Sequence, residues 1–271
     1  FSSVNYKKTH VFLDFNSEID RKELNQLIKS CDIIITNFKS GDEKKFKLDF
    51  KSCIKINDHI IYAKITGFKS NTKRVAYDIV LQAETGYISM TGNNKEYAKM
   101  PVAFIDVLAA HQIKEGILTA LILQNQEKKP YKVSTTLEET AIASLMNQSS
   151  NYLMANHQSK PMGTLHPNIA PYGEIVTTID NKELILAIGT DHQFENFSKI
   201  ISLDISIIKK FKTNPKRVKK RIELISILKE EIKSISSQYL LSSCLKKNIP
   251  IGEINSIKKV LESKLGKEMV L

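Results

Sequence analysis

The stretch "THVFLDFNSEIDRKELNQLIKSCDIIITNF", Thr9–Phe38, decides the fold class of this 271-residue chain. Its first part, Thr9–Phe15, alternates enough to predict a strand, and Ser17–Cys31 carries apolar residues at helical spacing. Asp32–Phe38 is then a continuous β-branched run, which is typical of a strand buried on both faces. A strand, a helix and a second strand in succession predict a βαβ unit in a parallel sheet, and therefore an α/β fold.

The pattern continues towards the C-terminus. Ile60–Phe68, "IIYAKITGF", predicts a third strand, and a helical pattern beside Asp106 runs to about Gln126, where "EKKPY" ends it. A further helix is predicted to begin near Thr136, which forms a candidate capping box with Glu139. These elements extend the α/β pattern through the first part of the chain.

A segment rich in Pro and Gly, Lys160–Glu174, is the clearest candidate for a domain boundary. Two short predicted strands follow it, "EIVTTID" at Glu174–Asp180 and "ELILAIG" at Glu183–Gly189, and then come basic helical stretches. We therefore predict a second, smaller domain after this boundary.

The composition favours a globular protein with anionic partners. The hydrophobic fraction is 42%, the formal net charge is +11 and the pI is near 9.3. Nucleic acid, an acidic membrane surface and a phosphorylated small molecule would all suit that charge. Because no tight Lys/Arg block is interleaved with aromatic residues, we interpret the charge as a solvated Lys-rich surface and expect no nucleic-acid partner.

Cysteine usage and apolar runs bear on the compartment. Cys31, Cys53 and Cys244 are odd in number and widely spaced, so a disulfide framework or zinc site is not expected and a reducing cytoplasm fits best. The longest apolar runs fall short of the ~18 residues of a membrane span, so we expect no membrane partner. The chain begins at Phe1 without a signal-peptide pattern.

Familiar catalytic motifs are absent: the sequence has no G-x-S-x-G, H-E-x-x-H, P-loop or G-x-G-x-x-G pattern. His111, His157, His166 and His192 lack the spacing of metal ligands, so we expect no metal. Phosphate binding would then depend on helix N-termini, strand-end loops and lysines.

Asp106 stands out because it lies between the apolar run Pro101–Ile105 and a long helical pattern. Aspartate is a favoured helix N-cap, since its carboxylate accepts hydrogen bonds from the free N–H groups of the first turn. A carboxylate in that place could also act in catalysis. The local sequence leaves both interpretations open.

Seven segments, taken in order, resemble the class III CoA-transferase family, which includes formyl-CoA and carnitine CoA-transferases and α-methylacyl-CoA racemases. The resemblance covers almost the whole chain. The segments are "DIIITNFKSGDEKKFKLDF", "IKINDHIIYAKITGFKS", "AYDIVLQAETGYISMTG", "PVAFIDVLAAHQIKEGILTALI", "HPNIAPYGEI", "IGTDHQFENF" and "FKTNPKRVKKRIEL".

The resemblance implies a domain layout. Residues 1–160 would form a Rossmann-like, parallel-sheet large domain that binds CoA, 161–255 a smaller α+β domain, and 256–271 a linker returning to the large domain. The family's first βαβ unit would precede Phe1. Family members are interlinked dimers, so an interlinked homodimer is expected.

The same resemblance implies site residues. Asp106 matches the nucleophilic aspartate, and Tyr77 and Asp78 match the pair that faces it. Gly163, between Met162 and Thr164, falls where the family has a mobile loop that closes over the aspartate.

Asn37 and Phe38 match a strand-end N-F-x-P-G turn that meets CoA, the co-substrate. Lys45 stands where the family usually has an arginine that binds CoA, and lysine keeps the charge but loses the bidentate fork. Ser40 replaces the proline of the turn, Ala110 replaces a glycine, and "KKPYK" replaces a G-x-G-Q segment.

The implied reaction moves CoA between an acyl-CoA and a carboxylic acid through an aspartyl-acyl anhydride and an aspartyl-CoA thioester at Asp106. Backbone N–H groups of the Gly163 loop would stabilise each oxyanion, at about 3 kcal/mol per donor. A helix N-terminus beneath Asp106 would keep it ionised.

Two alternatives remain. Racemisation next to a thioester needs proton-transfer groups on both faces of the carbon, and the racemases carry His-Asp where this chain has Tyr77 and Asp78. A tyrosine with a pKa near ~10 is a poor base beside imidazole at ~6.5, so the sequence favours transfer. The chain could also be a non-catalytic CoA-binding relative. The sequence does not identify the two acids.

Overall fold

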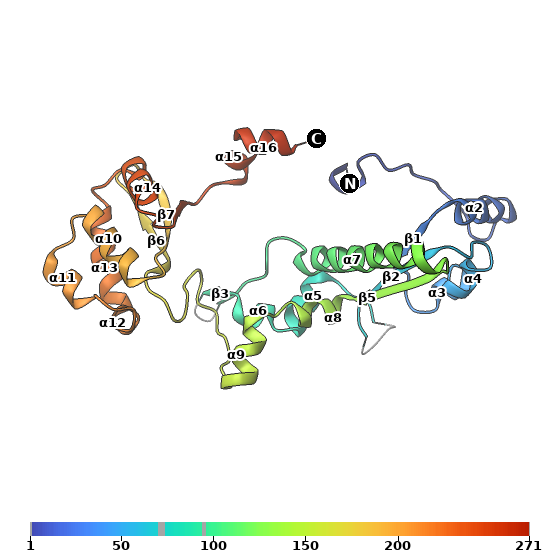
Figure 1. Cartoon of the computed structure of the whole chain (residues 1–271), viewed down its shortest axis with the longest axis horizontal. Helices are drawn as coiled ribbons and strands as arrows, with labels where there is room; N and C mark the ends of the chain where they lie inside the picture. The colour runs from blue at the N-terminus through green and yellow to red at the C-terminus, as the bar shows by residue number, and fades with distance from the viewer. Residues whose placement is uncertain (1, 70–73, 94–95, 271) are drawn as a thin grey trace. The chain divides into compact units, whose positions relative to one another are not determined.

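The computed structural model describes residues 2–69, 74–93 and 96–270, and it divides between Pro161 and Met162 into two compact units (Figure 1). Each unit has a sheet and a hydrophobic core of its own. No helix in the described part of the chain combines the length and apolar character needed to cross a membrane.

The first unit is built on a three-stranded parallel sheet. Its strands are β1 (Ile33–Thr36), β2 (Ile61–Thr66) and β5 (Tyr131–Thr136), in the order β1-β2-β5. Ile34 lies opposite Tyr62 across the first pair, and Ala63 lies opposite Val133 across the second. The predicted α/β class with a parallel sheet is therefore confirmed, together with the strands predicted within Asp32–Phe38 and Ile60–Phe68.

Alternate side chains of β2 point to opposite faces of this sheet. Tyr62 packs with Ile28 of α2 (Glu18–Ser30) and Cys53 of α4 (Phe50–Cys53). Ile61 and Ala63 pack on the other face against α7 (Phe104–Glu127), which runs along β2 and β5 (Figure 1). Helices thus cover both faces.

The long helix α7 confirms the helix predicted from Asp106 to about Gln126, and it begins two residues earlier. Its buried side chains recur every three or four positions, as a single face of an α-helix requires. They are Ile105, Ala109, Ile113, Ile117 and Ala120.

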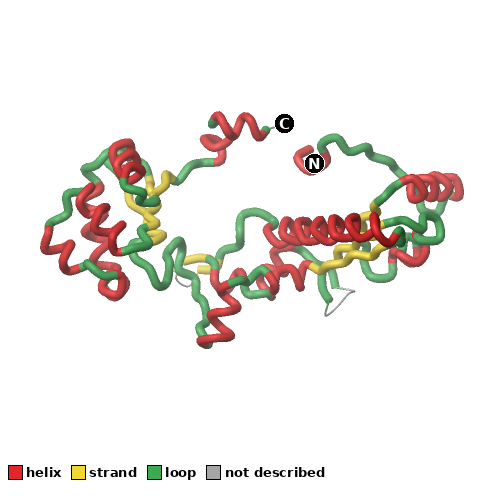
Figure 2. Tube along the Cα trace, in the orientation of Figure 1, coloured by secondary structure: helices red, strands yellow, loops and turns green. Residues whose placement is uncertain are grey.

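Shorter elements complete the first unit (Figure 2). A small cluster of Phe68, Leu81, Tyr87, Ile105 and Ala141 joins α5, α6, α8 and the start of α7. These elements are α1 (Ser2–Asn5), α3 (Asp42–Lys45), α5 (Asp78–Glu84), α6 (Tyr87–Met90), β3 (Gly92–Asn93), β4 (Glu96–Tyr97), α8 (Leu137–Ala143) and α9 (Asn147–Ala155).

Two predictions about the N-terminal strands are wrong. Thr9–Phe15 forms no strand, because no described strand pairs with it and Phe12 is 95% exposed. β1 is not buried on both faces, since Ile35 is 61% exposed. As an edge strand, β1 has a neighbour on one side alone, and the described residues leave Ile35 uncovered.

The region after α7 also differs from the prediction. β5 was not predicted, and the single helix expected after Thr136 is broken between α8 and α9, where Met146 has a φ of +49°. Thr136 caps α8 by accepting a hydrogen bond from the Glu139 N–H at 2.9 Å. The Glu139 carboxylate accepts from the Thr136 hydroxyl at 3.0 Å, so the reciprocal capping box does not form.

The second unit contains an antiparallel sheet of β6 (Tyr172–Thr177), β7 (Glu183–Ala187) and β8 (Ile251–Glu253), in that order. This confirms the two predicted strands, whereas β8 was not predicted. Helices follow β7 or β8: α10 (Asp191–Ile200), α11 (Ile205–Lys210), α12 (Asn214–Lys219), α13 (Arg221–Ile232), α14 (Ser237–Lys246), α15 (Ile257–Glu262) and α16 (Lys264–Met269).

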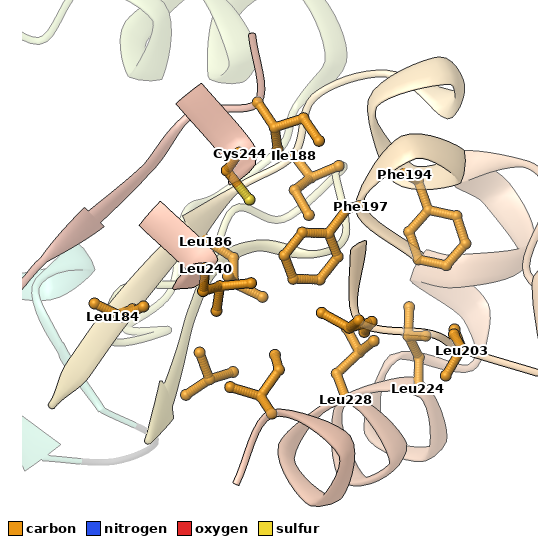
Figure 3. Packing of buried hydrophobic residues seen from close by; sticks show 14 of the residues in the cluster. Leu184, Leu186, Ile188, Phe194, Phe197, Leu203, Leu224, Leu228, Leu240 and Cys244 are labelled. Atoms are coloured by element: carbon orange, nitrogen blue, oxygen red, sulfur yellow. The ribbon is translucent and has the colours of Figure 1, made fainter. Parts of the chain in front are cut away.

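One contiguous core fills the second unit between its sheet and helices (Figure 3). β7 contributes alternate residues, α10 contributes two phenylalanines three positions apart, and α13 and α14 each contribute residues four apart. These are Leu184, Leu186, Phe194, Phe197, Leu224, Leu228, Leu240 and Cys244.

Candidate active site

A cleft of about 440 Å³ opens in the first unit where the three parallel strands end. Asn37–Ser40 follow β1, Ile65–Gly67 close β2, and Leu137 follows β5. Asp106 and Ala109 enter the lining from the first turns of α7. Open parallel sheets bind ligands outside the carboxyl ends of their strands, so this cleft is the candidate active site.

Asp106 is the third residue of α7 and lines the cleft from the first turn. It is not the N-cap, because Ala103 holds that position and makes no side-chain cap. The capping interpretation of Asp106 is therefore wrong. Its carboxylate is left to face the cleft.

The cap of α7 comes from another helix. Asp78, the first residue of α5, accepts hydrogen bonds through Oδ2 from the N–H groups of Ile105 at 2.7 Å and Asp106 at 3.3 Å. One turn later, the Gln82 amide donates to Asp78 Oδ1, and Gln82 Oε1 accepts from the Met100 N–H at 2.9 Å. Asp78 thus lies behind Asp106 and supports its backbone.

Charges around Asp106 act in opposite directions. Partial withdrawal from water raises the pKa of Asp106 above its usual range, and the negative charge of Asp78 raises it further. The N-terminus of α7 favours the ionised form, as expected, and so opposes both effects. Lys39 and Arg74 are the cationic side chains of the cleft lining.

Arg74 is already engaged by neighbouring side chains. Its Nη1 donates to Glu84 Oε2 at 2.7 Å, and its guanidinium lies 4.4 Å from the centre of the Phe68 ring. Lys39 comes directly after the Asn37–Phe38 turn. Both cations suit a cleft that receives anionic groups.

The structure brings some of the predicted site residues together and not others. Asn37 and Phe38 line the cleft with Asp106. Tyr77 is 69% exposed and is not part of that lining. Lys45, also outside the lining, is exposed at the end of α3, with its Nζ 5.4 Å from the centre of the Phe46 ring.

Gly163 lies in the second unit. It adopts a φ of +63°, in the left-handed region that glycine enters without a steric penalty. Thr164, the next residue, donates from its hydroxyl to the Gly173 carbonyl at 2.6 Å. The loop is thereby tied to the start of β6.

Sequence reasoning missed Lys39, Thr66, Arg74 and Gln82. The end of the predicted strand Ile60–Phe68 was an available signal, because strand-end loops of a parallel sheet form the binding edge. Gly67 belongs to that loop, and a Cβ there would lie 2.2 Å from the Ala76 Cβ. Only glycine allows the two segments to approach so closely.

Thiol and metal chemistry find little support in the described residues. Burial raises the pKa of Cys53 to about 11 and that of Cys244 to about 12, so both thiols stay protonated at neutral pH. Within residues 2–69, 74–93 and 96–270, no group of three or more His, Cys, Asp and Glu side chains is arranged to hold a metal ion.

The model of CoA-transferase family III matches residues 1–269. The chain belongs to this family. The resemblance inferred from the seven segments is therefore confirmed, and it extends over both units.

Named relatives agree with that assignment. The succinate–glutarate CoA-transferase of Agrobacterium fabrum is 30% identical over 265 residues, which cover 96% of this chain and 66% of that protein. The human succinyl-CoA:glutarate CoA-transferase is 28% identical, over 96% of this chain and 60% of its own length. The chain thus spans less than two thirds of these curated relatives.

A solved structure shows the same fold. The crystal structure of a CaiB/BaiF family protein from Brucella suis matches with a TM-score of 0.85 and 32% identity. The match covers 96% of this chain and 70% of that one.

Proposed function

We propose that this family III member is a CoA-transferase that moves CoA between an acyl-CoA and a carboxylic acid, with Asp106 as the nucleophile. One observation carries the proposal: Asp106 faces a cleft at the carboxyl ends of the parallel strands while another carboxylate, Asp78, caps its helix. Asp106 is therefore free of the capping role that its position suggested.

The chemistry proceeds in four acyl-transfer steps. An Asp106 carboxylate oxygen attacks the donor thioester carbonyl, which forms an aspartyl-acyl anhydride and releases CoA thiolate. The thiolate attacks the aspartyl carbonyl, which releases the donor acid and leaves an aspartyl-CoA thioester. The acceptor carboxylate attacks that thioester to form a new anhydride and thiolate, and the thiolate takes the acceptor acyl group and frees Asp106.

Other residues receive roles within the same proposal. Asn37 and Phe38 would hold CoA at the cleft, with Lys45 meeting a phosphate group; Lys39 lines the cleft and is the nearer cation for that purpose. Tyr77 would contact the substrate and Asp78 would orient Asp106.

Gly163 belongs to the loop that would supply oxyanion donors, each worth about 3 kcal/mol. Its left-handed φ directs the backbone in a way that other residues adopt only with strain.

The domain and subunit layout is also a proposal. Residues 1–160 would form a Rossmann-like CoA-binding domain, 161–255 a small α+β domain and 256–271 a return linker. Exposed apolar residues on the solvent side of α7 support an interlinked homodimer, because large exposed apolar side chains commonly mark interfaces. They are Val107, Leu118 and Ile122, each at least 50% exposed.

Two further features follow from the relatives and the cysteines. Because the first relatives are named for succinate and glutarate, we propose short dicarboxylic acids as acyl donor and acceptor. The three cysteines are unpaired, which supports a reducing cytoplasm as the location.

The test is CoA transfer by the wild type and by Asp106→Ala, starting with succinyl-CoA and glutarate and extending to a panel of acyl-CoAs and acids. The variant should lose transfer while its fold persists, because Asp106 is not the cap of α7. Glu18→Gln is the matched control, since Glu18 lies in the first turn of α2 and outside the cleft lining. Near-normal turnover of Asp106→Ala would refute the proposed mechanism.

A further inference from the structure

Gln82 is a buried polar residue behind the candidate active site. It is 1% exposed, and both ends of its amide are used. Because Gln82 follows Asp78 by one turn of α5, the two side chains lie on the same face of that helix. Gln82 is not part of the cleft lining, so it does not meet the substrate directly.

The Gln82 amide connects two parts of the chain that precede Asp106. Its Oε1 accepts from the Met100 N–H at 2.9 Å, which fixes the segment entering α7. Its Nε2 donates to Asp78 Oδ1, which leaves Oδ2 directed at the N–H groups of Ile105 and Asp106. One neutral side chain therefore sets both the approach to the helix and its cap.

We propose that Gln82 is a positioning residue for CoA transfer: by fixing the Asp78 carboxylate and the Met100 backbone, it holds the first turn of α7 so that Asp106 faces the cleft. The effect on turnover rests on the proposed function. The effect on the first turn of α7 does not, because it depends on hydrogen bonds within the chain alone.

The first turn of α7 is sensitive to this arrangement because the opening N–H groups of a helix have no intrahelical acceptor. Ala103 provides no side-chain cap, so Asp78 is the side chain that satisfies Ile105 and Asp106. If the Asp78 carboxylate is not held, these amides open to water more often and Asp106 loses its fixed direction.

Amide hydrogen exchange at neutral pH, read residue by residue by NMR, measures this directly. In Gln82→Met, which removes both hydrogen bonds at similar volume, exchange at Ile105 and Asp106 should rise about tenfold, the factor expected for losing one hydrogen bond of ordinary strength. Exchange at Ile113 and Ile117, deeper in the same helix, should be unchanged and so report an intact fold.

Gln82→Glu separates the two halves of the bracket. Its carboxylate still accepts from the Met100 N–H but no longer donates to Asp78. Exchange should therefore rise at Ile105 and Asp106 while Met100 stays protected. Gln126→Glu, at the exposed end of α7, makes the same change of charge as a control and should alter neither signal.

Turnover provides the second readout. Both Gln82 variants should lower kcat about tenfold with an unchanged KM for the acyl-CoA, since Gln82 acts on the nucleophile and not on CoA binding. Unchanged exchange at Ile105 and Asp106 would overturn the proposal, and raised exchange with normal kcat would overturn its link to catalysis. A wild type without transfer activity would instead refute the proposed function, and the exchange result would stand by itself.

Discussion

Asp78 in the first unit and Glu174 in the second are carboxylates that the fold treats in opposite ways. Asp78 accepts hydrogen bonds from the backbone N–H groups of Ile105 and Asp106 and from the Gln82 amide. Its charge is used to cap a helix. Because donors surround it, it can remain ionised beside the candidate nucleophile.

Glu174, on β6, is 3% exposed, and neither of its oxygens accepts a hydrogen bond within the described part of the chain. Arg221 Nε lies 3.3 Å from Oε1 as an ion-pair partner. Burial nevertheless raises the pKa of Glu174, and the attraction of Arg221 offsets this only in part. The comparison teaches that hydrogen-bond donors, more than one nearby opposite charge, let a withdrawn carboxylate keep its charge.

The largest expected effect is that of Arg221→Met. The change leaves Glu174 buried without its ion pair and removes the donor to the carbonyls of His166 and Ile169. The second unit should lose about 3–5 kcal/mol of its free energy of unfolding. Urea denaturation followed by hydrogen exchange of the β6 and β7 amides measures the loss.

Lys220→Met is the matched control for Arg221→Met. Lys220 is an exposed neighbour whose ion pair with Glu223 spans 3.9 Å, so its loss should cost less than about 1 kcal/mol. Equal losses in the two variants would show that Glu174 does not depend on Arg221.

A smaller effect is expected for Asp78→Ala. Removal of the cap should lower the free energy of unfolding of the first unit by about 1–2 kcal/mol. It should also lower the pKa of Asp106, because the negative charge of Asp78 raises that pKa. NMR titration of ¹³C-labelled aspartate carboxyl groups reads the second effect.

Asp49→Ala is the control for the Asp78 variant. Asp49 caps α4 by accepting from the N–H groups of Lys51 and Ser52, so its loss should cost a similar free energy. It should leave the pKa of Asp106 unchanged. A pKa of Asp106 that stays constant in Asp78→Ala would remove the electrostatic part of the comparison.

The smallest effect is the pH dependence of Glu174→Gln. The folded pKa of Glu174 lies above its ordinary value of 4.5, so the folded state holds this proton more tightly than the unfolded state does. As pH rises from 4.5 through the folded pKa, the wild type should lose stability relative to the variant, by about 1.4 kcal/mol for each unit of the shift. Urea midpoints measured from pH 4 to pH 7 would show no such trend if Glu174 were well solvated.

Elements whose sequence pattern is local and periodic were predictable. α7 has apolar residues at helical spacing over its full length, and the hairpin of β6 and β7 alternates between turn residues. β5 was missed because it begins directly after the Pro130 segment that ends the helical pattern. Thr9–Phe15 has strand-like alternation but no described partner strand, and a strand requires one.

The candidate site was predictable only in part. Asp106, Asn37 and Phe38 could be inferred from sequence, and they line one cleft. The cap of α7 could not be inferred, because local rules look for a cap beside the helix start, whereas Asp78 is 28 positions from Asp106. Gln82 gave no signal for the same reason, since its role depends on contacts made by folding.

The most direct test of the central claim is to trap the intermediate at Asp106. Hydroxylamine added during turnover with an acyl-CoA and an acceptor acid should convert Asp106 to a hydroxamate, because the anhydride and the thioester are both open to that nucleophile. Peptide mass spectrometry should find the hydroxamate at Asp106, and not at Asp78, only when the acyl-CoA is present. CoA transfer with an unmodified Asp106 would contradict the account, as would deuterium exchange next to the thioester of a 2-methylacyl-CoA without any trapping.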